Sequence, residues 1–144
     1  MSRIGFSYFP RLIIDPITKH QVDEVFIPYI PIRLSIAHNN PTRLIDALID
    51  SGSDRNLFPL SLGEMLGINF KKAIQKIICG IGDCQITAFT AKINIYVNNT
   101  KYVTEADFSP QQETLLLGRQ GFFNLFKTVT FDENEKFTYL ETGG

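Results

Sequence analysis

The stretch Ala47-Leu48-Ile49-Asp50-Ser51-Gly52-Ser53-Asp54 decides how this chain is interpreted. Three apolar residues lead directly into an aspartate, and that aspartate opens a tight glycine turn. A carboxylate at the end of a buried strand loses hydration and needs hydrogen bonds from neighbouring hydroxyl and amide groups. Aspartates also form such bonds merely to cap a turn, so these residues alone leave a capping role and a chemical role open.

The segments around this turn are short and alternate between apolar and polar residues, which is typical of half-buried strands. No long stretch has a helical period, so the sequence predicts a mainly β protein. The chain contains no internal repeat and no linker. Strands are predicted at residues 30–36, 43–49, 101–107 and 127–140, the last as a hairpin, and at 73–97 as two strands around the tip Gly80-Ile81-Gly82-Asp83.

Two short helices are also predicted. The first begins after Pro59, which is tolerated in a first turn, and ends at Gly67, a residue type that commonly closes a helix. The second follows Gly118-Arg119, where Phe122, Phe123 and Phe126 form an apolar face.

The length of 144 residues predicts one domain, because two separate cores would each be too small to offset chain entropy. We expect residues 1–25, the least patterned part, to form an irregular N-terminal arm, and residues 26–144 to form the domain. Charged residues make up 20% of the chain and the formal net charge is −1, so nucleic acid is not an expected partner. No apolar run approaches the length of a membrane span or a signal peptide, which makes a cytoplasmic location the default expectation and a membrane partner unexpected.

Only two cysteines occur, Cys79 and Cys84. They are too few for a disulfide framework, and neither histidine lies at ligand spacing from them, so no metal site and no cofactor are expected. The two cysteines bracket the tip of the predicted hairpin at 73–97, where a disulfide between them is sterically plausible. In a reducing cytoplasm we expect free thiols instead.

Three motifs together resemble the retropepsin-like aspartic proteases. The Asp50-Ser51-Gly52 turn after Ala-Leu-Ile matches the catalytic turn of that family. The hairpin at 76–82 resembles its glycine-rich flap, and Leu115-Leu116-Leu117-Gly118-Arg119 resembles its second signature before the C-terminal helix. In order and spacing the three agree with the family across roughly three fifths of the chain. The resemblance implies a single-domain acid-protease β-barrel with a flap and one or two short helices.

The resemblance also implies roles for individual residues. Asp50 is the expected catalytic carboxylate, supported by Ser51 and Gly52, with Ser51 forming a hydrogen bond across a dimer. A hydrogen bond from the Ser53 hydroxyl to Asp50 is expected from pepsin-like relatives. The substrate-binding residues it implies are Ser53, Asp54, Gly80, Ile81, Gly82 and Leu116, and Arg119 is expected to support Asp54 through a charge-assisted pair.

Some features depart from the family pattern. About 45 residues precede the strand of Asp50, and a hairpin follows the second predicted helix, so a dimer interface made of terminal strands is not assured. Asp83 stands at the flap tip where many members have glycine, and Ser53 replaces the alanine usual in viral members.

A carboxylate protease needs two carboxylates facing one water. No other aspartate in this chain is followed by Ser/Thr-Gly, and Glu141-Thr142-Gly143 lies too close to the end to build a second turn. One chain therefore holds half a site, and a two-fold homodimer would complete it. The function this predicts is an aspartic endopeptidase acting on peptides with apolar side chains around the cleaved bond.

Two alternatives remain open at this stage. A protease-like fold without catalysis would serve as a dimerisation or peptide-binding module, although the intact Asp-Ser-Gly argues against it. A phosphate loop at Gly80-Ile81-Gly82 lacks the lysine and helix that such loops require.

Overall fold

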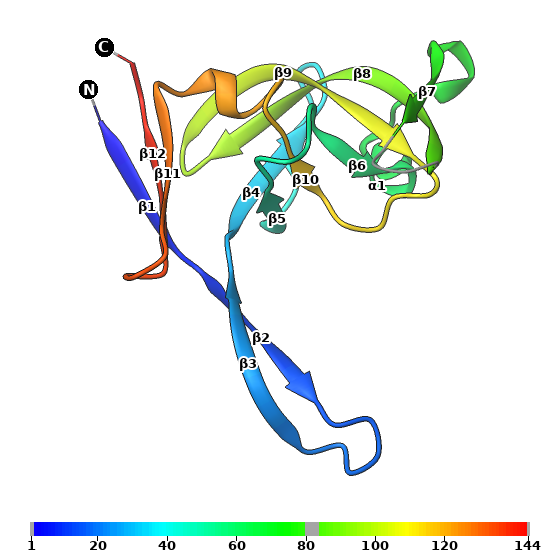
Figure 1. The fold of residues 1–144 in the computed structure, drawn as a ribbon. Helices are drawn as coiled ribbons and strands as arrows, with labels where there is room; N and C mark the ends of the chain where they lie inside the picture. The colour runs from blue at the N-terminus through cyan, green and yellow to red at the C-terminus, as the bar shows by residue number, and fades with distance from the viewer. Residues whose placement is uncertain (1, 80–83, 144) are drawn as a thin grey trace. The chain divides into compact units, whose positions relative to one another are not determined.

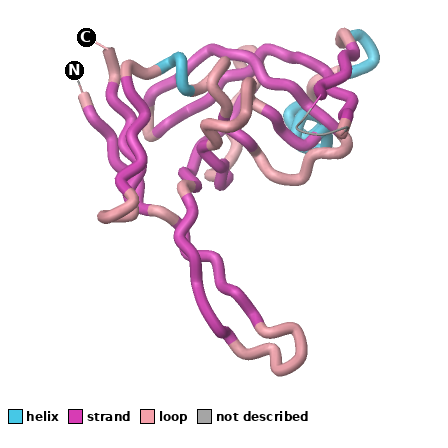
Figure 2. Tube along the Cα trace, in the orientation of Figure 1, coloured by secondary structure: helices cyan, strands magenta, loops and turns pink. Residues whose placement is uncertain are grey.

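The computed structural model describes residues 2–79 and 84–143. Strand runs through most of this part of the chain, and helix is confined to short segments (Figure 2). The mainly β class predicted from the sequence is therefore confirmed. In chain order the strands are β1 (Arg3–Ser7), β2 (Phe9–Ile14), β3 (Gln21–Ile27), β4 (Tyr29–Ser35), β5 (Ile45–Ile49), β6 (Leu57–Pro59), β7 (Gln75–Cys79), β8 (Gln85–Val97), β9 (Thr100–Ser109), β10 (Leu116–Leu117), β11 (Thr128–Asp132) and β12 (Phe137–Glu141).

The chain divides into two compact units (Figure 1). One unit comprises Met1–Ile30 and Phe126–Gly144. It contains the antiparallel sheet β1-β12-β11 and the two-stranded hairpin β2-β3. The sequence predicted an irregular arm for residues 1–25, but most of the described part of it forms the strands β1, β2 and the first part of β3. The sequence of the β2-β3 hairpin lacks the alternation of apolar and polar residues that predicts a strand, because both faces of the hairpin carry apolar side chains that stay exposed.

The other unit, Pro31–Leu125, holds a closed sheet. Its strands follow the order β4-β5-β10-β6-β9-β8-β7, and the additional pairing of β4 with β8 closes six of them into a barrel. Strand β7 lies outside that closure and pairs with β8 alone. Two pairs in the barrel are parallel, β5 with β10 and β6 with β9, so the sheet is mixed.

Inward-pointing aliphatic and aromatic side chains fill the barrel. The alternation predicted for residues 30–36 is confirmed for 30–34, because Ile30, Ile32 and Leu34 are fully buried, but at the end of the strand Ser35 is buried instead of Ile36. Phe58 and Phe108 pack edge to face with ring centroids 5.7 Å apart, a geometry that adds to the stability gained by burial alone.

Helix α1 (Leu60–Leu66) ends as the sequence predicted. Gly67 adopts φ 93°, and its backbone N–H donates to the Glu64 carbonyl. A left-handed residue at this position favours glycine, because a side chain would be strained there.

The helix predicted after Gly118-Arg119 is much shorter than expected. Only a 3-10 turn, η2 (Phe123–Leu125), forms. Gly121 has φ 108°, and its N–H donates to the side chain of Asn124 instead of continuing a helix. The apolar pattern reflected burial, since Phe122 and Phe126 are both buried. A second 3-10 turn, η1 (Phe70–Lys72), was not predicted.

Cys79 and Cys84 are exposed and free. The partner of Cys79 across the β7-β8 pair is Gln85, so the two cysteines are not directly opposite each other. In the part of the chain that the structure describes, no helix has the length and apolar character needed to cross a membrane.

Candidate active site

Asp50 follows directly after β5, in the middle of the barrel sheet. Strand β5 lies parallel to β10, with Leu48 opposite Leu116 and Ile49 opposite Leu117. The backbone N–H of Asp50 donates to the Leu117 carbonyl at 3.0 Å. The two sequence motifs that flank the candidate site are therefore hydrogen-bonded to each other.

The turn after Asp50 is stabilised by two hydrogen bonds within the turn, one to the Asp50 side chain and one to its main chain. Oδ1 of Asp50 accepts a hydrogen bond from the Gly52 N–H at 2.9 Å, and the Asp50 carbonyl accepts one from the Ser53 N–H at 3.1 Å. A Cβ on Gly52 would lie 3.2 Å from that same carboxylate oxygen. Asp50 is half-buried, so its carboxylate is fixed in orientation but remains open to a ligand.

A second segment runs beside this turn and locks it. The N–H groups of Arg119 and Gln120 donate to the carbonyls of Ser53 and Asp54 at 2.9 and 2.8 Å. Gly118 lies so close to Arg55 that a Cβ there would collide with the Arg55 backbone. The glycine of the second motif is therefore required by close approach of two main chains.

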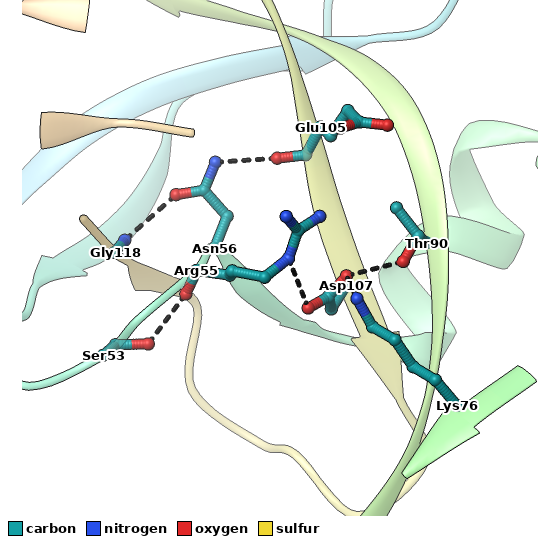
Figure 3. A network of polar contacts seen from close by, with 8 residues as sticks. All are labelled: Ser53, Arg55, Asn56, Lys76, Thr90, Glu105, Asp107 and Gly118. Atoms are coloured by element: carbon teal, nitrogen blue, oxygen red, sulfur yellow. Dashed lines mark hydrogen bonds and ion pairs between the residues drawn. The ribbon is translucent and has the colours of Figure 1, made fainter. Parts of the chain in front are cut away.

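Asn56 ties this crossing to strand β9. Its side chain is fully buried. Oδ1 accepts from the Gly118 N–H at 3.0 Å and Nδ2 donates to the Glu105 carbonyl at 2.9 Å (Figure 3). Both ends of the amide are thus hydrogen-bonded, as a buried polar group requires.

A cavity of about 470 Å³ opens beside the turn. The turn from Asp50 to Arg55 forms one side, and strand β7, which includes Ile78, forms another. Leu57 and Leu116 supply apolar wall, and of these Leu116 was expected from the sequence to bind substrate. The cavity has the size and mixed lining of a site for a peptide side chain.

Three charged residues that line the same cavity, Arg55, Lys76 and Asp107, form a charge cluster (Figure 3). Asp107 on β9 is fully buried and accepts from Arg55 Nε at 2.9 Å, Lys76 Nζ at 2.8 Å and Thr90 Oγ1 at 2.8 Å. Burial raises the pKa of Asp107, but hydrogen bonds from Lys76, Arg55 and Thr90, together with the Arg55 charge, outweigh it and leave the pKa below its usual value. Asp107 is therefore ionised at neutral pH.

Several predicted site residues are brought together, and others are not. Asp50, Gly52, Ser53, Asp54 and Leu116 all line the one cavity. Ser51 is exposed, and its hydroxyl makes no hydrogen bond within the described residues of its own chain. The flap-tip residues expected to bind substrate, Gly80, Ile81 and Gly82, lie outside the described residues.

Two expected contacts are replaced by others. The Ser53 hydroxyl donates to the Arg55 carbonyl at 2.7 Å and not to Asp50. A hydroxyl can donate only one hydrogen bond, and here it donates to the nearby carbonyl. Both ion pairs within residues 2–79 and 84–143 belong to Asp107, so the expected pair between Arg119 and Asp54 is not formed. Arg119 supports the turn through its backbone N–H instead.

Sequence reasoning missed the polar network of Arg55, Asn56, Lys76, Thr90 and Asp107. One signal was available, because Asp107 lies between Ala106 and Phe108 in a strand with no turn residue beside it. An acid in such a run indicates a buried, paired carboxylate. Its partners were not identifiable, because they come from other strands. No group of three or more metal-ligating side chains is positioned to hold an ion in the described parts of the chain.

Comparison with solved structures identifies the fold. No family model matches the sequence, and no curated protein matches it significantly. Among solved structures, a retropepsin-like aspartic protease from Rickettsia conorii is similar over 97% of this chain and 99% of its own, with a TM-score of 0.61 and 12% identity. The EIAV protease, solved with an inhibitor, is similar over 65% of this chain and 82% of its own, with a TM-score of 0.52 and 17% identity. The fold is that of retropepsin-like aspartic proteases, as the three motifs predicted.

Proposed function

We propose that this protein is an aspartic endopeptidase whose two catalytic carboxylates come from two copies of the chain. The observation that carries the proposal is the setting of Asp50. Its carboxylate is half-buried, oriented by the Gly52 N–H, and faces a cavity that strand β7 also lines. A turn cap would need no such cavity.

The chemistry requires a pair of carboxylates that share one proton. The ionised Asp50 takes a proton from a water molecule, which attacks the carbonyl carbon of the peptide bond. The protonated Asp50 of the other copy donates to the carbonyl oxygen. Collapse of the tetrahedral intermediate breaks the C–N bond, with a proton delivered to the leaving nitrogen.

A homodimer follows from the count of motifs. Each chain has one Asp-Ser-Gly turn, so a monomer holds one of the two carboxylates. In a two-fold dimer a residue near the axis faces its own counterpart. Ser51, exposed and without a partner among the described residues, is free to bond across that axis.

The remaining roles concern substrate binding. Asp54 is exposed at the cavity and accepts hydrogen bonds from substrate main-chain amides. Leu57 and Leu116 contact apolar side chains near the cleaved bond. We assign the hairpin of β7 and β8 to the flap that covers the bound peptide, and the flap residues expected from the sequence, Gly80, Ile81 and Gly82, to substrate binding.

A mixed peptide library tests the proposal. The purified protein is incubated with the library at acidic and at neutral pH, with and without an active-site inhibitor of aspartic proteases, and products are identified by mass spectrometry. We expect cleavage next to apolar residues that the inhibitor abolishes.

The matched variant is Asp50→Asn, which keeps the shape of the side chain but cannot exchange the proton. We expect it to lose hydrolysis by at least about a thousandfold while keeping its fold, as judged by circular dichroism. Undiminished cleavage by the variant would exclude an aspartic protease. Peptide binding by the wild type without cleavage would instead favour a peptide-binding module.

A further inference from the structure

The charge cluster of Arg55, Lys76 and Asp107 carries a net positive charge. Arg55 and Lys76 contribute two positive charges, and Asp107 contributes one negative charge. The side chains of Arg55 and Lys76 are 36% and 35% exposed, whereas that of Asp107 is fully buried. The negative charge is therefore hidden within the wall, and the positive charges are the ones that a ligand would meet.

The two cations also retain unused hydrogen-bond donors. Both oxygens of Asp107 are occupied, Oδ2 by Arg55 Nε and Oδ1 by Lys76 and Thr90. Arg55 keeps the N–H groups of both Nη nitrogens, and Lys76 keeps two N–H groups on Nζ. Neither side chain donates to any other described residue. These remaining donors have no acceptor among the described residues, so a further acceptor comes from a ligand or from water.

The cluster lines the same cavity as Asp50, and the strand register relates the two. Asp107 lies opposite Leu57, Leu57 opposite Leu116, and Leu116 opposite Leu48. Measured along the sheet, three strand spacings or roughly 14 Å separate the main chains of Asp107 and Leu48, and the curvature of the barrel makes the direct distance shorter. Long Arg55 and Lys76 side chains shorten that span, and an extended peptide advances about 3.3 Å per residue.

The other two carboxylates that line the cavity, Asp50 and Asp54, belong to the turn. Their repulsion of an anion at the cluster is opposed by the positive charges of Arg55 and Lys76, and salt weakens it. Hydrogen bonds from Arg55 and Lys76 act directly on the anion and are charge-assisted.

We propose that the cluster of Arg55, Lys76 and Asp107 binds an acidic side chain of the substrate, two or three residues from the cleaved bond. The inference rests on the proposed function and names its substrate class: peptides with apolar residues at the cleaved bond and a glutamate or aspartate nearby. Asp107 acts here as a positioning residue, because it holds the two cations at the cavity without contacting the substrate.

A peptide series tests this assignment. Each decapeptide has Leu-Phe at its centre and alanine elsewhere, and one residue, Glu or Gln, is moved through three positions on either side. For the wild type at low salt we expect kcat/KM to favour Glu over Gln by about fivefold to tenfold at one position two or three residues from the cleaved bond. The preference should weaken as salt is added.

Two variants locate the preference. Lys76→Met and Arg55→Gln should each bring the ratio of kcat/KM for the Glu peptide to kcat/KM for the Gln peptide toward one at that position. This holds even if the variant lowers both values of kcat/KM. Lys101→Met, an exposed lysine of β9 outside the cavity, should leave the ratio as in the wild type. A wild type that does not distinguish Glu from Gln at any position, or a ratio that survives Lys76→Met and Arg55→Gln, would overturn the inference.

Binding measurements separate this inference from the proposed function. The same peptides are titrated into Asp50→Asn, which lacks the catalytic carboxylate. Tighter binding of the Glu peptide without cleavage by the wild type would support the acidic subsite and refute the protease. Cleavage of Glu and Gln peptides at equal rates would support the protease and refute the subsite, and a failure of both Glu and Gln peptides to bind would refute the subsite as well.

Discussion

Asp107 is the charged residue whose neutralisation should lower the stability of the barrel most. Its fully buried carboxylate accepts three hydrogen bonds, two of them from cations. Asn in its place leaves both cations without a counter-charge, although their partial exposure lets water compensate in part. We expect Asp107→Asn to lower the free energy of unfolding by about 2 kcal/mol, measured by urea denaturation. Asp46→Asn, an exposed residue of β5, is the matched control and should change it little.

The difference in unfolding free energy between the wild type and Asp107→Asn should depend on pH in a defined way. Because the pKa of Asp107 is lowered in the folded state, its stabilising effect is present above the ordinary value of 3.8 and is lost as pH falls through the folded pKa. The difference in unfolding free energy between wild type and Asp107→Asn should therefore stay constant from pH 7 to about pH 5 and shrink below about pH 4. A difference that grows on acidification would contradict this account of the cluster.

Ser53 should have no part in tuning the catalytic carboxylate. Its proton is donated to the Arg55 carbonyl, and Asp50 Oδ1 is satisfied by the Gly52 N–H. We expect Ser53→Ala to leave both pH limits of kcat/KM where they are in the wild type. A shift of the whole profile to higher pH would mean that the hydroxyl does reach Asp50, as the family resemblance had suggested.

At the scale of elements, the crossing of the Asp50 turn and the segment after β10 holds the site together. The crossing depends on Gly118, because any Cβ there would collide with the Arg55 backbone. Neither main chain can move away without breaking the bonds from Arg119 and Gln120 to the turn. We expect Gly118→Ala to lower the unfolding free energy by about 3 kcal/mol or more, because an overpacked site must shift backbone.

Thermal and urea unfolding measure that effect. Gly143→Ala serves as the control, since its Cβ would meet only Lys127 Cβ at an ordinary distance of 3.9 Å. Equal stability of Gly118→Ala and wild type would show that the two segments do not approach as closely as described.

Elements with a local cause were predictable from the sequence. The turn at Asp50, the end of α1 at Gly67 and the buried face of β4 each depend on residues that are neighbours in the chain. The second helix was wrong because Phe122 and Phe126 are buried for packing, while Gly121 turns the backbone away from a helix. A local apolar pattern does not distinguish side chains that are buried on the face of a helix from side chains that are buried in irregular structure.

The charge cluster could not be predicted, because it is a product of topology. Arg55 follows the turn, Lys76 comes from β7, Thr90 from β8 and Asp107 from β9. Only the strand order of the sheet, with β7 added at the edge of β8, brings these four together. The motifs therefore predicted the turn at which we propose that the chemistry takes place, and the strand order determines which side chains surround it.

At the scale of the whole molecule, the account requires that two chains share one site. Mixing wild type with Asp50→Asn at constant total concentration tests this requirement most directly, provided that the chains are allowed to exchange before kcat/KM is measured. If a pair of ionisable Asp50 residues is needed, activity should follow the square of the wild-type fraction, which gives about one quarter of full activity in an equal mixture. Activity that falls in simple proportion, to about one half, would show that each chain acts alone and would contradict the shared dyad.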